Sequence, residues 1–135
     1  MTQTPAQSAE RPFHVLYVED NPASRRLMGE LFKTQPHLRL SCCESAEDGI
    51  ELASIERPDL ILMDINLPSI DGYQALGILR HEPRTAHIPV IAVTANAMLA
   101  DIDRGKQAGF FDYLTKPLDL RKLLALVNDL ASQRA

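Results

Sequence analysis

Residues 60–68 read Leu-Ile-Leu-Met-Asp-Ile-Asn-Leu-Pro, and they carry the strongest local signal in the chain. Four consecutive apolar residues followed by Asp64 predict a strand that is buried on both faces and ends in a carboxylate. Four further runs are candidate strands, at residues 13–18, 38–43, 88–94 and 110–114. Strands of this composition are typical of parallel sheets that helices cover on both sides.

Segments with helical periodicity alternate with these runs. They lie near residues 22–34, 45–56, 72–82, 97–107 and 119–132. In the last segment, leucines repeat at three- and four-residue spacing, which makes it the clearest helix. Pro22 suits a first helical turn, whereas Ser45 and Asp119 suit N-cap positions.

Strands that alternate with helices predict an α/β fold with a single five-stranded parallel sheet, the flavodoxin-like doubly wound arrangement. The runs at 38–41 and 111–114 interleave polar residues, as edge strands do. Together with right-handed crossovers, this favours the strand order 2-1-3-4-5. We expect one domain at 13–132, between a flexible N-terminal tail (1–12) and a short C-terminal tail (133–135).

The composition excludes several classes of protein. The chain has 135 residues, 45% of them hydrophobic, and a net charge of −4, which argues against a nucleic-acid-binding surface. No apolar run approaches the roughly 20 residues of a membrane span. Residues 1–12 lack the apolar core of a signal peptide. Cys42 and Cys43 are adjacent and predict no disulfide framework, so a cytoplasmic location is expected.

Charged and hydroxyl side chains lie at the carboxyl ends of four of the predicted strands. Glu19 and Asp20 follow the first strand, Asp64 ends the third, Thr94 ends the fourth and Lys116 follows the fifth. In this fold, ligands bind beyond the carboxyl ends of the strands. Clustered carboxylates repel one another unless a cation is present, and Mg²⁺ prefers such oxygen ligands. With the metal, a carboxylate nucleophile, a hydroxyl and an ammonium group suit phosphoryl transfer.

The strand ends also carry four motifs in a fixed order: Val18-Glu19-Asp20-Asn21, residues 62–68 with Asp71-Gly72, Val93-Thr94-Ala95 and Leu114-Thr115-Lys116-Pro117. This pattern resembles the response-regulator receiver domain of two-component signal transduction, from about Phe13 to Leu130. The resemblance implies a phosphorylation-activated switch, which catalyses only its own phosphorylation and dephosphorylation on an aspartate.

The resemblance also implies roles for individual residues. Asp64 would be the phosphoacceptor. Asp20 would bind Mg²⁺ directly, Glu19 would act mainly through water, and the backbone carbonyl of Asn66 would be a further ligand. Two residues would contact the phosphoryl group, namely Thr94 and Lys116.

Further expectations from the resemblance concern switching and partners. Thr94 and Tyr113 would form the switch pair, and the Lys116–Pro117 bond would be cis.

The phosphoryl donor would be a histidine kinase or a histidine phosphotransfer protein. Candidate docking contacts lie on the first helix, at Arg25, Arg26 and Met28. The output surface would comprise the fourth helix, fifth strand and fifth helix, and would bind an unidentified downstream protein. No nucleic acid or membrane partner is expected, and the chain would be a monomer or weak dimer.

Several alternatives stay open at this point. Asp20 also suits an N-cap, because it precedes the helix that begins at Pro22. The protein is either a single-domain regulator, the favoured reading, or a receiver from a hybrid histidine kinase. A third possibility is a receiver-like module that binds partners without phosphorylation. A haloacid-dehalogenase-type phosphatase is disfavoured, because Asn66 stands where that reaction needs a second acid.

Overall fold

In the computed structural model, five parallel strands form one sheet in the order β2-β1-β3-β4-β5. The structure describes residues 11–68, 70–95 and 109–133. The strands are β1 (Phe13–Val18), β2 (Leu38–Cys43), β3 (Leu60–Asp64), β4 (Val90–Thr94) and β5 (Asp112–Thr115). Both the fold class and the strand order predicted from the sequence are confirmed.

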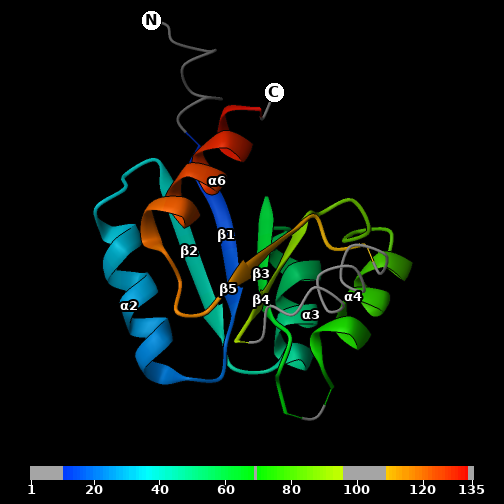
Figure 1. The fold of residues 1–135 in the computed structure, drawn as a ribbon. Coiled ribbons are helices and arrows are strands. Elements are labelled where there is room, and N and C mark those ends of the chain that lie inside the picture. Colours follow the sequence, from blue (N-terminus) through cyan, green and yellow to red (C-terminus); the bar gives the residue numbers. More distant parts are fainter. Residues whose placement is uncertain (1–10, 69, 96–108, 134–135) are drawn as a thin grey trace, which may run out of the picture.

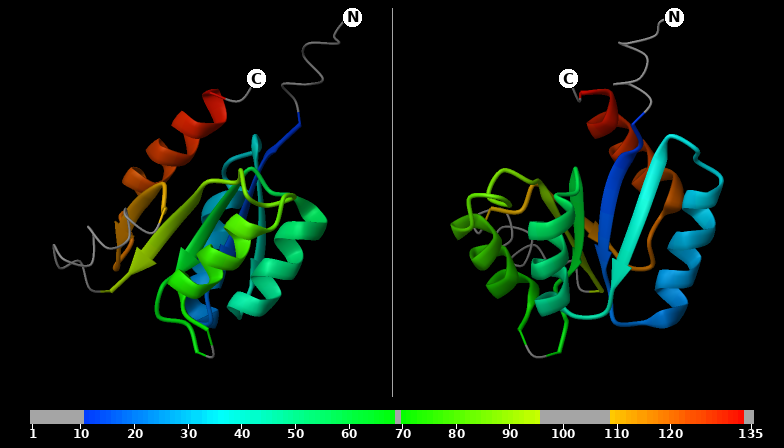
Figure 2. Two further views of the ribbon diagram at one scale, coloured as in Figure 1. Left: turned by 90° about the vertical axis from the view of Figure 1, so that its right-hand side faces the viewer. Right: turned by 180° about the vertical axis from the view of Figure 1, so that it is seen from behind.

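Helices cover both faces of the sheet (Figures 1 and 2). Those within the described ranges are α2 (Pro22–Lys33), α3 (Ala46–Glu56), α4 (Gly72–His81) and α6 (Leu120–Ser132). α2 and α6 lie on one face, and α3 and α4 lie on the other. None of these four helices is long and apolar enough to cross a membrane. The helix predicted at 97–107 falls outside the described residues.

Two hydrophobic cores form because neighbouring residues of a strand point to opposite faces. Leu16 and Val18 of β1 pack in the core under α3 and α4. Val15 and Tyr17 of the same strand pack in the core under α2 and α6. Every residue of β1, β3 and β4 is buried, whereas β2 and β5 are partly exposed. This is the difference between central and edge strands expected from their compositions.

Two strands begin later than the apolar runs suggested. β4 begins at Val90, because Ile88 instead closes a turn by donating its N–H to the carbonyl of Thr85 at 3.0 Å. β5 spans Asp112–Thr115, after a turn in which Gly109 has a φ of 109°. The residues just before β5 pack against the sheet: Phe110 is buried in the core under α3 and α4.

The helix starts match the sequence signals with one exception. Ser45 and Asp119 cap α3 and α6, and Pro22 lies in the first turn of α2, as predicted. The N-cap of α2 is Asn21, however, and not Asp20: the Asn21 side chain accepts hydrogen bonds from the N–H groups of Ala23 and Ser24 at 2.8 and 3.2 Å. The carboxylate of Asp20 is therefore not used by the cap.

Candidate functional site

The three predicted acidic residues meet at the carboxyl ends of two central strands. Val18 of β1 pairs with Met63 of β3, so the residues that follow them lie side by side. Oxygens of Glu19, Asp20 and Asp64 all lie within 4.8 Å of one another. Glu19 and Asp64 are buried at 1% and 4% exposure, and Asp20 is exposed. The cluster is therefore half inside the protein and open to solvent on the Asp20 side.

Lys116 supplies a positive charge to this cluster. Its ammonium nitrogen lies 2.8 Å from Glu19 Oε1 and 3.0 Å from Asp64 Oδ2. Burial alone lowers the pKa of Lys116, but hydrogen bonds to both carboxylates and their charges outweigh burial and raise it. The backbone N–H of Lys116 donates to the carbonyl of Thr94 at 2.7 Å, and the Lys116–Pro117 peptide bond is cis, as expected.

The second oxygen of Asp64 is held by the loop that follows β3. The N–H of Asn66 donates to Asp64 Oδ1 at 2.9 Å. The intervening residue, Ile65, is anchored on both sides: its N–H donates to Val93, and its carbonyl accepts from Gly72 at the start of α4. Both oxygens of the predicted acceptor therefore have donors, and the backbone donor on Oδ1 is held in place because Ile65 is anchored to β4 and α4.

Glu19 has donors that the sequence did not indicate. The N–H of Asn21 donates to Oε2 at 3.1 Å, and the hydroxyl of Tyr17 donates to Oε1 at 3.2 Å. Arg25 also reaches this residue, because its Nη1 donates to the Glu19 carbonyl at 2.8 Å. Burial, followed by the charge of Glu19, raises the pKa of Tyr17. One feature of the sequence could have indicated the contact between Tyr17 and Glu19. Tyr17 lies within an otherwise aliphatic strand, and a buried tyrosine hydroxyl usually needs a hydrogen-bond partner.

The two predicted switch residues occupy neighbouring strands. Thr94 ends β4 and is 3% exposed. Tyr113 is on β5, partly buried, and packs against the core under α3 and α4. In the parallel pairing of these strands, Tyr113 is opposite Ala92 and Thr94 is opposite Thr115. Thr94 therefore lies at the carboxyl end of β4 and Tyr113 lies on β5, as expected. The movement of the two residues on phosphorylation stays a prediction.

One predicted docking contact is wrong. Met28 is 1% exposed and packs in the core under α2 and α6, so a partner cannot reach its side chain. Successive helical residues are about 100° apart, and the inward face of α2 carries Met28 and Phe32. Leu27, by contrast, is 56% exposed, and Arg26 is exposed beside it.

The cluster fits a hard divalent cation. Its carboxylate oxygens are ligands of the kind that Mg²⁺ takes, and one side of the cluster is open to water. The cluster contains three carboxylates, and the ammonium group of Lys116 contacts two of them, which leaves an excess of negative charge for a cation to neutralise. Asp20, with its carboxylate outside the cap, is the accessible member of the set.

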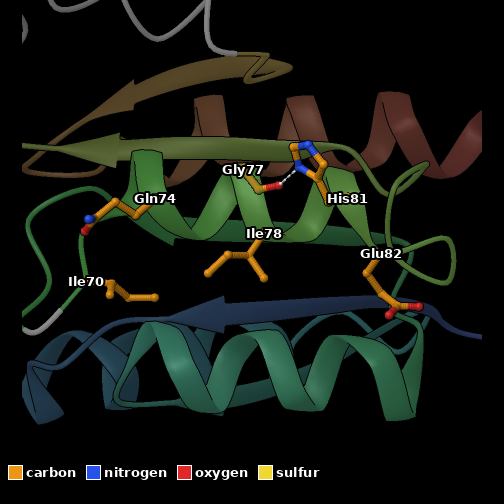
Figure 3. A pocket seen from close by; sticks show the side chains of 6 residues that line it. All are labelled: Ile70, Gln74, Gly77, Ile78, His81 and Glu82. Atoms are coloured by element: carbon orange, nitrogen blue, oxygen red, sulfur yellow. Dashed lines mark hydrogen bonds between the residues drawn. The ribbon is translucent and has the colours of Figure 1, made fainter.

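The surface of the described residues includes a pocket beside the acidic site and a groove on α4. A pocket of about 160 Å³ adjoins the acidic site and is lined by Tyr17, Ser24, Leu27, Lys116, Pro117 and Leu118. The groove on α4 is lined by Ile70, Gln74, Gly77, Ile78, His81 and Glu82, and Figure 3 shows Ile78 projecting from the helix between Ile70 and Glu82. None of the clustered carboxylates lines the α4 groove, so we assign it no part in the chemistry of the site.

The chain is similar in sequence to known signalling proteins. Protein PilH of Pseudomonas aeruginosa is 39% identical over 114 residues, which cover 84% of this chain and 93% of PilH. The signal transduction histidine-protein kinase BarA of Escherichia coli is 40% identical over 110 residues, which cover 81% of this chain but 12% of the kinase.

A solved structure of similar fold contains a metal ion. The receiver domain of the sensor histidine kinase PA1611 of Pseudomonas aeruginosa, with a magnesium ion in its active-site cleft, superposes with a TM-score of 0.80. It is 31% identical, and the match covers 90% of this chain and 98% of that one. The sequence model of the response regulator receiver domain matches residues 15–128. The chain therefore belongs to the response-regulator receiver domain family of two-component signalling.

Proposed function

We propose that this receiver domain accepts a phosphoryl group on Asp64 in a reaction that requires Mg²⁺. One observation carries the proposal: Glu19, Asp20 and Asp64 present oxygens within 4.8 Å of one another, while Lys116 bridges two of them. A metal ion at the cluster would neutralise charge on the phosphoryl oxygens. Asp20 would bind it directly, Glu19 through water, and the Asn66 carbonyl would be a further ligand.

The transfer step uses a carboxylate oxygen of Asp64 as the nucleophile. This oxygen forms a bond to the phosphorus of a phosphohistidine donor while the phosphorus–nitrogen bond breaks. The imidazole leaves with the electron pair and is protonated by water. Lys116 and Thr94 would hydrogen-bond the transferred oxygens, which carry the charge that develops in such reactions. Later attack by water would release inorganic phosphate and regenerate the carboxylate. The domain would thus catalyse only its own phosphorylation and dephosphorylation.

The donor would be a histidine kinase or a histidine phosphotransfer protein. The 160 Å³ pocket supports docking of the donor beside α2, because the exposed Leu27 of α2 and Lys116 of the proposed reactive site both line this pocket. A side chain in this pocket would bring the donor imidazole next to the acidic cluster. Arg26 of α2 would contribute a charged contact, and Arg25 would act through its bond to the Glu19 carbonyl.

The output would be a shift between two conformations of the domain. Phosphorylation would draw the Thr94 hydroxyl toward the phosphoryl group, and Tyr113 would turn inward. The surface around β5 and α6 would then bind a downstream protein.

Free thiols at Cys42 and Cys43 support a cytoplasmic setting. The relatives include both a chain of similar length and the receiver portion of a long kinase.

Intact-mass analysis after incubation with acetyl phosphate and Mg²⁺ tests the proposal. The wild type should gain one phosphoryl group as the phosphorus–oxygen bond of the reagent breaks and acetate leaves. Asp64→Ala should gain none, and EDTA should prevent the gain in the wild type. Asp129→Ala is the matched control, because it removes an exposed carboxylate of α6 that lies outside the cluster. An equal gain in Asp64→Ala would contradict the assignment.

A beryllofluoride titration covers the case in which hydrolysis outpaces detection by mass. Beryllofluoride is a phosphoryl mimic, and with Mg²⁺ it should raise the melting temperature of the wild type but not of Asp64→Ala. A wild type that neither gains mass nor responds to beryllofluoride would instead be a phosphorylation-independent binding module.

A further inference from the structure

Tyr17 places a single polar atom at the inner boundary of the acidic cluster. Its side chain is fully buried at 0% exposure in the core under α2 and α6. Its hydroxyl donates to Glu19 Oε1 at 3.2 Å, and the same oxygen accepts from the ammonium of Lys116 at 2.8 Å. One carboxylate oxygen, itself buried, therefore has two donors of different kinds.

The two donors differ in their freedom to move. Tyr17 also lines the small pocket beside the site, but its side chain is packed in the core under α2 and α6, so its hydroxyl is held in place with the sheet. The side chain of Lys116 is 29% exposed and already divides its ammonium between Glu19 and Asp64. In the proposed function this ammonium also serves the phosphoryl oxygens. A shift of Lys116 toward them that lengthens its 2.8 Å contact with Glu19 Oε1 weakens the charged donor of that oxygen.

A buried carboxylate oxygen that loses its donor is destabilised. The second oxygen, Oε2, is held by the backbone N–H of Asn21 at 3.1 Å, which is fixed at the start of α2. With Tyr17 on Oε1 and Asn21 on Oε2, Glu19 keeps one immobile donor on each oxygen. Its orientation toward Asp20 and Asp64 then no longer depends on where Lys116 lies.

We propose that Tyr17 is a positioning residue, whose hydroxyl stays on Glu19 and keeps this carboxylate aimed at the cluster when Lys116 moves to a phosphoryl oxygen. The inference rests on the proposed function. Tyr17 touches neither the phosphoryl group nor the acceptor in this scheme. It acts through Glu19, and it matters most in the phosphorylated state.

The test compares Tyr17→Phe with the wild type in two calorimetric titrations. Mg²⁺ affinity should change less than about threefold, because Lys116 still serves Glu19 when no phosphoryl group is present. Beryllofluoride affinity at saturating Mg²⁺ should fall about tenfold, the effect of one lost hydrogen bond to a charged group. Tyr73→Phe is the matched control, because Tyr73 packs edge-on against Phe110 outside the cluster, and it should leave both affinities unchanged.

A second measurement needs neither metal nor phosphoryl mimic. Lys116→Met removes the ammonium from Glu19 while keeping an unbranched side chain. In this background, Tyr17→Phe should lower the midpoint of urea unfolding by more than it does in the wild-type background, because Glu19 Oε1 then loses its second donor. If Tyr17 contributed only packing, the two shifts would be equal.

The outcomes separate this inference from the function on which it rests. Wild-type protein that does not bind beryllofluoride with Mg²⁺ would overturn the proposed function. Wild type that binds while Tyr17→Phe binds equally well would overturn only the role of Tyr17. Equal weakening of Mg²⁺ and beryllofluoride binding would also overturn it, because the hydroxyl would then serve the resting cluster and not the phosphorylated state.

Discussion

At the scale of single residues, the acidic site is organised around one ammonium group between two buried carboxylates. Lys116 lies within 3.0 Å of oxygens on both Glu19 and Asp64. A buried ion pair of this kind contributes little net stability, because removing charges from water costs about as much as their attraction returns. In the proposed function, its value lies in holding the oxygens of Asp64 in place for phosphoryl transfer.

A buried histidine far from this cluster provides a prediction about pH. His14 is 4% exposed, and its Nε2 lies 2.7 Å from the hydroxyl of Ser41, which donates to Glu56 at 2.9 Å. Burial, followed by the charge of Arg39, lowers the pKa of His14 below its usual 6.5. Below pH 6.5 the unfolded chain therefore binds more protons here than the folded protein does, so acidification destabilises the fold.

Urea unfolding of the wild type and His14→Gln between pH 5.5 and 7.5 checks this prediction. The wild type should lose free energy of unfolding more steeply as the pH falls, with an excess slope of at most about 1.4 kcal/mol per pH unit. Because the other titrating groups are common to both proteins, the difference between the two slopes reports on His14. Parallel curves would contradict the predicted shift.

At the scale of secondary-structure elements, the start of α4 determines how the loop after Asp64 is held. A Cβ atom added to Gly72 would lie 2.9 Å from Ile65 Cα and 3.2 Å from the carbonyl oxygen of Asp64. These are backbone atoms, so the contact is relieved only when the loop or the helix shifts. The glycine therefore permits the close approach of α4 to the end of β3.

Two glycine substitutions in the same helix test this packing. Gly72→Ala should lower the free energy of unfolding by roughly 1–3 kcal/mol through overpacking, and it should weaken Mg²⁺ binding by displacing Asp64. Gly77→Ala should raise stability by roughly 0.5–1 kcal/mol, because a Cβ at this position meets nothing within 4 Å and alanine favours the helix. Urea unfolding and calorimetry measure both effects. Equal stability of the two variants would contradict the close approach at Gly72.

At the scale of the whole molecule, a metal ion at the acidic cluster would couple its binding to folding. The clustered carboxylates come from two strands, and in the unfolded chain they are far apart. An ion that binds only the folded form stabilises it by an amount that grows with its concentration, about 2.7 kcal/mol at 100 times the dissociation constant. We therefore expect Mg²⁺ to raise the melting temperature of the wild type.

Asp20→Asn separates this effect from other sources of stability. Asp20 is exposed and outside the helix cap, so the substitution removes a repelling charge without disturbing the core. The variant should melt higher than the wild type without metal, and it should respond much less to Mg²⁺. Thermal melts with and without Mg²⁺ measure both quantities. A full Mg²⁺ shift in Asp20→Asn would place the metal elsewhere.

Much of this molecule follows from local chemistry in the chain. Continuous apolar runs predicted β1, β3 and β4 as buried strands, and interleaved polar residues predicted β2 and β5 as edges. Carboxylates at the ends of β1 and β3 predicted a metal-binding cluster because parallel strands end at one edge of a sheet. Strand order and the cis Lys116–Pro117 bond also agree with expectation.

The wrong assignment of Met28 and the open alternative at Asp20 both concern residues whose role depends on direction in space. Met28 and Leu27 are equally apolar neighbours, and only the packing of α2 against the sheet decides that Met28 faces inward. Asp20 and Asn21 are both good N-caps, and the position of the first helical turn decides that Asn21 accepts the bonds. Periodicity places such residues on a helix, but it does not fix which face the core will cover.

The sequence by itself thus determined the fold, the strand order and the residues at the strand ends, because hydrophobic periodicity and turn chemistry act over short distances along the chain. The tertiary structure decided which donors reach each carboxylate oxygen. Tyr17 and Lys116 meet on one oxygen of Glu19 although 99 positions separate them in the numbering, because β1 and the loop after β5 end at the same edge of the sheet. Hydrogen bonds of this kind depend on positions in three dimensions, which residue order alone does not contain.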